Sequence, residues 1–177
     1  MKRQKNEGFT LIELLIVIGI LAVLAITVLL ALNPAEAQRK ARDTGRLKDV
    51  ATLQAIVDQY LNDNASTTSL IAGGTVSSNM RSNSRDCATG WLGVNVCGYA
   101  QRLPQDPNVN TTRQYTTDAG ITSAGIMYYG VATQNGTYKI CARQESQSNA
   151  SKITNTADGG SATNWYEVGS NLTLACP

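Results

Sequence analysis

The stretch Glu7-Gly8-Phe9-Thr10-Leu11-Ile12-Glu13-Leu14-Leu15 opens the longest apolar run of the chain. Residues 9–32 are almost wholly apolar, and these 24 residues would reach about 36 Å as one helix. The hydrocarbon core of a bilayer is about 30 Å thick. The run therefore predicts a helix that is long enough to span a membrane with some tilt.

Two ordinary interpretations of this run leave Glu13 unexplained. A cleaved secretory signal would use the basic start and the small-x-small site at residues 35–37, but its apolar part is usually only about 7–15 residues long. A plain signal anchor accounts for the length. In both cases a carboxylate enters the membrane helix, and a charge at the centre of such a helix costs about 2.5–3.5 kcal/mol on insertion scales.

A cut after Gly8 gives Glu13 a partner. The new chain would begin with a free α-amine on Phe9, and Glu13 of one subunit can neutralise that amine on a neighbouring subunit. Pairing two buried charges offsets much of their desolvation cost. Within one helix the two groups are also four residues apart, which is close enough for contact.

The quoted stretch closely resembles the class III signal of type IV pilins and pseudopilins. The resemblance implies cleavage between Gly8 and Phe9 by a prepilin peptidase that also N-methylates Phe9, and it makes Glu13 the assembly residue. It further implies a structural subunit of a homo-oligomeric or mixed filament, with an assembly ATPase and a platform protein as partners. The subunit would cross the cytoplasmic membrane once, with its globular domain outside, and would later stand in a pilus or pseudopilus at the cell surface.

Several functions remain open within and beyond this class. An adhesion or motility pilus, a secretion pseudopilus and a DNA-uptake pilus share the signal. The alternative class is a secreted or membrane-anchored binding module with an ordinary signal sequence. We do not expect an enzyme, because the chain has no histidine, which is the commonest general base, and the sequence offers no nucleophile–base pair.

The charge balance gives no support to nucleic-acid binding. The net charge is +2, and removal of residues 1–8 would leave 12 basic and 12 acidic side chains. Basic residues flank the apolar run on both sides, so the positive-inside rule alone does not orient it. The basic residues that follow the run are Arg39, Lys40, Arg42, Arg46 and Lys48.

The chain is expected to have four parts: a leader (residues 1–8), a transmembrane assembly helix (9–33), an amphipathic helix (34–62) and an extracytoplasmic globular domain (63–177). Pro34 would kink the long helix, as in pilin-like proteins, or Asn33 would cap a new helix whose first residue is Pro34. In the amphipathic helix, apolar residues recur every three or four positions at Leu47, Val50, Leu53, Val57, Tyr60 and Leu61. The expected polar side carries Arg39, Arg46, Lys48, Asp49 and Asp58.

The globular domain is predicted to be a small antiparallel sheet of three or four strands packed on this helix, which makes an α+β, pilin-like fold. Residues 125–133 and 137–145 form a predicted hairpin around the Asn135-Gly136 turn. Residues 164–169 and 171–175 supply one or two more strands. Residues 66–85 are predicted to be a surface loop, and residues 103–107 resemble the Pro-x-Asp-Pro loop of major pseudopilins.

Four cysteines lie beyond the apolar run, at Cys87, Cys97, Cys141 and Cys176. An even number on one side of a membrane segment indicates disulfides in an oxidising compartment, and the lack of histidine and of Cys-x2-Cys argues against zinc. Of the three pairings, we favour Cys87–Cys97, which closes a short loop. The remaining pair, Cys141–Cys176, would then tie the last residues to a strand of the hairpin.

No cofactor is expected, with calcium as the one alternative. Residues 156–160, Thr-Ala-Asp-Gly-Gly, loosely resemble the calcium loop of major pseudopilins. Asp158 and Glu167 are the carboxylates that could serve as ligands. The competing interpretation is a plain Asp-Gly turn.

Overall fold

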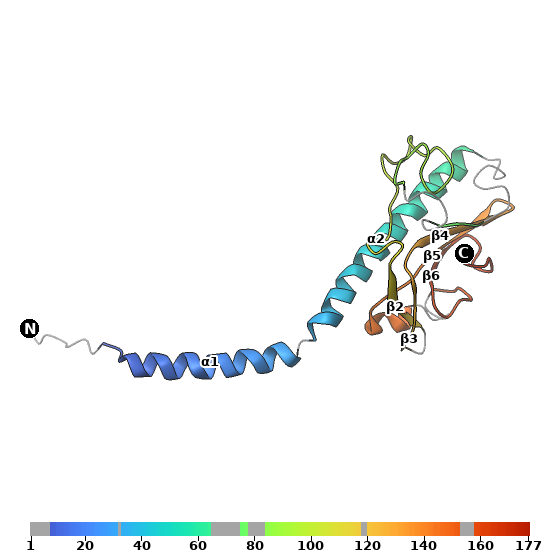
Figure 1. The fold of residues 1–177 in the computed structure, drawn as a ribbon. Helices are drawn as coiled ribbons and strands as arrows, with labels where there is room; N and C mark the ends of the chain where they lie inside the picture. The colour runs from blue at the N-terminus through green and yellow to red at the C-terminus, as the bar shows by residue number, and fades with distance from the viewer. Residues whose placement is uncertain (1–7, 32, 65–74, 78–83, 118–119, 153–157) are drawn as a thin grey trace, which may run out of the picture. The chain divides into compact units, whose positions relative to one another are not determined.

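The computed structural model describes residues 8–31, 33–64, 75–77, 84–117, 120–152 and 158–177 (Figure 1). Most of the leader and part of the predicted loop at residues 66–85 lie outside the described residues. The chain divides into two units, residues 1–37 and residues 38–177, and each is described by itself.

The first unit contains helix α1, Leu11–Ala31. Its large apolar side chains are exposed around the whole helix, and residues Leu11–Leu29 meet the length and composition required to cross a membrane. A helix that is apolar on every side needs an apolar environment, which is supplied either by lipid or by other helices. The predicted apolar helix is therefore present, with the length and composition that are needed to cross a membrane.

A second helix, α2, spans Pro34–Asp63 and starts with its own cap. Asn33 has a φ of 42°, and its Oδ1 accepts the Glu36 N–H at 3.3 Å. Its carbonyl accepts the N–H groups of Glu36 and Ala37. Asn33 is thus the N-cap and Pro34 the first helical residue, a position that suits proline because its missing N–H would have no partner there. The structure therefore shows a new helix that begins at Pro34, and not one long helix that is kinked there.

The second unit combines α2 with two antiparallel sheets. The larger sheet has the strand order β1-β4-β5-β6, formed by Thr75–Ser77, Tyr129–Gln134, Thr137–Ala142 and Tyr166–Gly169. The smaller sheet pairs β2, Thr112–Thr117, with β3, Gly120–Ile126. A 3₁₀ helix, η2, covers Gln147–Lys152. The expected α+β layout of a long apolar helix, a second helix and small antiparallel sheets is confirmed.

The predicted hairpin is also confirmed. Asn135 and Gly136 have φ values of 47° and 83°, so both turn residues adopt the left-handed conformations that a tight hairpin requires. Strands β4 and β5 pair in register from Tyr129 opposite Ala142 to Gln134 opposite Thr137.

Other strand predictions were wrong in part. The run 125–133 was predicted as one strand, but it contains the end of β3 and most of β4. Strand β1 lies in the predicted loop. Residues 164–169 and 171–175 were predicted to supply one or two strands, and they supply one, β6, in the first of these ranges. The β2–β3 sheet was not predicted, because β2 is mostly polar and its first three residues are exposed.

One apolar core joins the helix to the sheet. Of the predicted stripe, Tyr60 and Leu61 are partly buried against this core, and Leu47 is half-buried. Its other three residues, Val50, Leu53 and Val57, are buried together with Ile56, which was not predicted. They pack with residues of β4 and β5 and of the segment before β2, namely Trp91, Leu92, Val96, Leu103, Tyr129, Val131, Tyr138, Ile140 and Ala142. The disulfide Cys87–Cys97 closes the loop that carries Trp91 and Leu92 into this core.

Arg46 was expected on the polar side of α2, and this prediction was wrong. Its side chain is fully buried and contacts three carboxylates. Nε and Nη2 donate to the two carboxylate oxygens of Asp106 at 2.7 and 3.1 Å, Nη1 donates to Asp43 at 2.7 Å, and Nη2 also donates to Glu145 at 2.6 Å. One guanidinium thus fastens two distant segments of the chain to α2.

The neighbours of Arg46 complete this ionic cluster, which we define as Arg42, Asp43, Arg46, Asp106 and Glu145. The carboxylate of Asp43 accepts hydrogen bonds from the backbone N–H groups of Glu145 and Ser146 and from the side-chain amide of Asn149. Arg42 makes a two-pronged contact with Glu145, at 3.1 and 2.6 Å. Burial alone would lower the pKa of Arg46, but Asp106 and Glu145 raise it overall. Burial would likewise raise the pKa of Glu145, and the two arginines lower it instead.

We predict that Arg46→Met destabilises the domain by about 3–5 kcal/mol, because it leaves three buried carboxylates short of their cation. The measurement is urea unfolding of the full chain in detergent, followed by circular dichroism. Lys48→Met, an exposed position half a turn away on the same helix, is the matched control and should change the free energy of unfolding by less than about 0.5 kcal/mol. Equal effects of the two variants would contradict a structural role for the cluster.

Candidate processing and assembly site

Helix α1 begins with a capping box formed by Thr10 and Glu13. The Thr10 N–H and hydroxyl donate to Glu13 Oε2 at 2.8 and 2.6 Å, and the Glu13 N–H donates back to the Thr10 hydroxyl oxygen at 3.3 Å. This reciprocal arrangement satisfies N–H groups that have no partner at the start of a helix. Glu13, whose carboxylate costs free energy inside a membrane, therefore helps to define where α1 starts.

Gly8 and Phe9 lie just outside the first turn. Both are exposed, and Phe9 retains 85% of its accessible surface. A Cβ atom added to Gly8 would meet no atom within 4 Å. The peptide bond between the predicted cleavage residues is thus accessible, and it lies outside the helical hydrogen-bond pattern that would protect it.

The Glu13 carboxylate has one oxygen engaged in the capping box, and Glu13 helps to line a small hollow. Both hydrogen bonds use Oε2, and among residues 8–31 no hydrogen bond to Oε1 is found. Gly8, Phe9, Thr10 and Glu13 line a hollow of about 250 Å³ at this end of the helix. An amine created at Phe9 would lie one residue before Thr10, so the capping box holds the carboxylate near the place where the charge appears.

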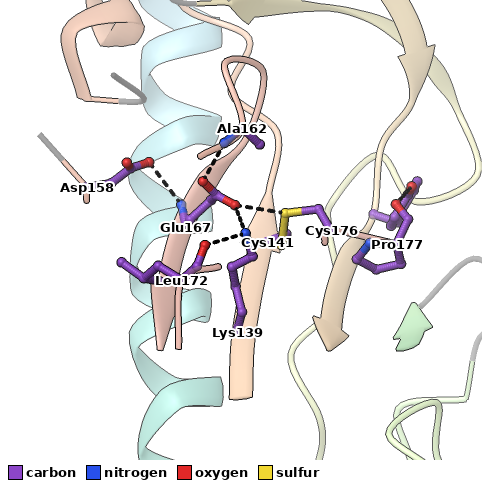
Figure 2. The surroundings of a disulfide bond; sticks show 9 residues. Lys139, Cys141, Asp158, Ala162, Glu167, Leu172, Cys176 and Pro177 are labelled. Atoms are coloured by element: carbon purple, nitrogen blue, oxygen red, sulfur yellow. Dashed lines mark hydrogen bonds and ion pairs between the residues drawn. A yellow bond between two sulfur atoms is a disulfide. The ribbon is translucent and has the colours of Figure 1, made fainter. Parts of the chain in front are cut away.

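The cysteines pair as expected, although they lie in the other unit. Cys87–Cys97 and Cys141–Cys176 are disulfides with Cα–Cα distances of 4.8 and 5.9 Å, and the second ties the end of the described chain to β5 (Figure 2). Linking residues that are distant in sequence removes conformational freedom from the unfolded chain and typically stabilises a domain by about 2–4 kcal/mol.

The two calcium candidates are brought together. Glu167 lies in β6 and is buried, and its backbone N–H donates to Asp158 Oδ2 at 3.2 Å. The Glu167 carboxylate forms an ion pair with Lys139, a fully buried residue of β5 (Figure 2). Lys139 was not among the predicted site residues. Its position inside the hairpin predicted only a strand residue, and its partner is 28 residues further along the chain.

Thr10 was also missed as a functional residue, although its signal is local. A threonine followed three positions later by glutamate, just before an apolar run, is the sequence pattern of a capping box. The capping box was not predicted, because Glu13 was assigned only the role of a partner for the Phe9 amine.

We predict that Thr10→Val accelerates hydrogen exchange of the Glu13 amide about five-fold, because loss of a cap costs about 1 kcal/mol. Amide exchange measured by NMR in detergent micelles tests this. Thr27→Val is the control, since the Thr27 hydroxyl donates to the Leu24 carbonyl within the helix and caps nothing. An unchanged Glu13 amide in Thr10→Val would show that the capping box does not hold the first turn.

Comparison with known proteins finds a match that covers this region. Residues 3–29 match the model of the prokaryotic N-terminal methylation motif. No curated protein and no solved structure matches the chain. The matched region contains Gly8, Phe9 and Glu13 and most of the helix that follows them. The chain therefore carries a type IV pilin-like, prepilin-type N-terminal signal.

Proposed function

We propose that the chain is a structural subunit of a type IV pilus or of a type II secretion-like pseudopilus, polymerised through α1. The observation that carries the proposal is the methylation motif at residues 3–29, which leads into a helix that is apolar on all sides. Such a helix suits lipid before assembly and a bundle of identical helices afterwards, because both environments are apolar.

Processing prepares the helix for this change. A prepilin peptidase cuts between Gly8 and Phe9 and methylates the new amine. The amine then pairs with Glu13 of a neighbouring subunit, which offsets the cost of burying both charges in the filament. The capping box supports this step, because it holds Glu13 at the end of the helix where the amine is formed.

The membrane orientation follows from the leader, with residues 1–8 in the cytoplasm and the second unit outside. The basic residues after α1 do not fix the orientation by themselves, because basic residues flank the apolar run on both sides. An assembly ATPase and a membrane platform protein would drive polymerisation, and the chain itself would catalyse no reaction.

The test of processing is the N-terminus of the mature protein from its native host. We expect N-terminal sequencing and intact mass to give a chain that begins at N-methylated Phe9. A bulky residue in place of Gly8, as in Gly8→Leu, should leave the leader attached. A mature chain that begins near Gln38 would instead show an ordinary secretory signal and a released binding module.

The test of assembly is Glu13→Leu. We expect membrane insertion to be retained, because the substitution makes the helix more apolar, while filaments seen by electron microscopy are lost. Insertion is measured by carbonate extraction of membranes. Glu36→Leu, which changes a carboxylate outside α1, is the control for general loss of charge. Normal filaments in Glu13→Leu would rule out the proposed pairing with the amine.

A further inference from the structure

The C-terminal part of the domain is organised around a buried ammonium group. Lys139 and Glu167 project from the adjacent strands β5 and β6, and both side chains are fully buried. The Lys139 ammonium contacts Glu167 Oε1 and donates a second hydrogen bond to the Leu172 carbonyl oxygen at 3.0 Å (Figure 2). One lysine thus connects a strand, a buried carboxylate and the segment that leads to Cys176.

The two carboxylates of this region already have donors at all four oxygens. Glu167 Oε1 meets Lys139, and Glu167 Oε2 accepts the Ala162 N–H at 2.9 Å. Asp158 Oδ1 accepts the Gly160 N–H at 2.9 Å, and Oδ2 accepts the Glu167 N–H. A calcium ion needs about 6–8 oxygen ligands with lone pairs directed at it. Here each of the four carboxylate oxygens already accepts a hydrogen bond from an N–H group.

The space around the Glu167 carboxylate is closed as well. A Cβ atom added to Gly160 would lie 1.8 Å from Glu167 Oε2, so the loop backbone packs directly on the carboxylate and only glycine fits. On the other side, the Cys176 sulfur lies 3.3 Å from Glu167 Oε1. A divalent ion would have to displace both the ammonium and the covering loop.

The neighbouring sulfurs supply no metal ligand either. Cys141, Cys176 and Glu167 place three atoms of ligand type within 4.8 Å of one another. Both sulfurs belong to the Cys141–Cys176 disulfide, so neither can act as the thiolate that a soft metal requires. The described residues around Glu167 therefore do not fit the calcium site that the sequence resemblance suggested.

We propose that the ammonium of Lys139 is the built-in cation of this C-terminal loop, taking the structural role that a bound divalent ion would otherwise have. A buried carboxylate without a countercharge is strongly destabilising. Lys139 supplies that charge from within the chain, and it orders the loop at Leu172 with its second hydrogen bond. The fold of this segment is consequently independent of calcium.

The first experiment uses the full-length wild-type chain in detergent and inorganic calcium as the probe. Thermal unfolding is recorded in EDTA and in increasing millimolar calcium chloride, together with calorimetric titration. We expect one unchanged midpoint and no heat of binding. A midpoint that rises with calcium concentration would overturn the proposal, because a ligand that binds the folded state must stabilise it.

The second experiment tests the coupling between the two charges. Lys139→Met should lower the midpoint by about 10 °C, since it leaves Glu167 buried without its partner. The double variant Lys139→Met/Glu167→Gln should regain more than half of that loss, because the unpaired charge is gone. Lys48→Met is the matched control on an exposed site.

Two outcomes of this second experiment would overturn the proposal. One is a Lys139→Met midpoint equal to that of the control, and the other is a double variant no more stable than Lys139→Met. If Lys139→Met does not fold, the calcium titration of the wild type still decides between a lysine and a metal, because it requires no variant.

Discussion

The second unit depends on one buried guanidinium. Arg46 lies at the point where α2, the Asp106 loop and the segment after β5 meet, and each of them sends a carboxylate to it. A buried charge of this kind is tolerated only when its partners are complete. The segments that supply Asp106 and Glu145 are therefore both held in their native positions by the same guanidinium.

A second buried cation, the ammonium of Lys139, lies on the other side of the sheet. It pairs with a single buried carboxylate, that of Glu167. Together the two sites explain how a domain with few large apolar residues holds long loops in place. Polar and charged side chains connect segments at positions where the apolar core does not extend. The two disulfides also hold loops in place: Cys87–Cys97 closes the loop that enters the apolar core, and Cys141–Cys176 lies beside Glu167.

Features that rest on local patterns could be predicted from the sequence. The apolar helix follows from residues 9–32, and the hairpin follows from Asn135-Gly136, because each signal lies within one element. The cysteine pairing was reached by considering loop lengths. The ionic cluster could not be predicted, since Arg46 is 60 residues from Asp106 and 99 from Glu145, and an arginine among polar neighbours on a helix indicates a solvated face. The paired carboxylates Asp158 and Glu167 were found, but their cation was not.

The position of the capping box has a consequence for maturation. In the proposed processing, Thr10 and Glu13 both lie on the C-terminal side of the cut, so the processed chain would keep the capping groups at the start of α1. Removal of the leader would leave these hydrogen bonds in place, and the change at this end would be electrostatic. The new positive charge would stand at the positive end of the helix dipole, which is an unfavourable place for it. Maturation would thus convert a relaxed helix end into one that gains free energy by acquiring a nearby anion, without any rearrangement of the backbone.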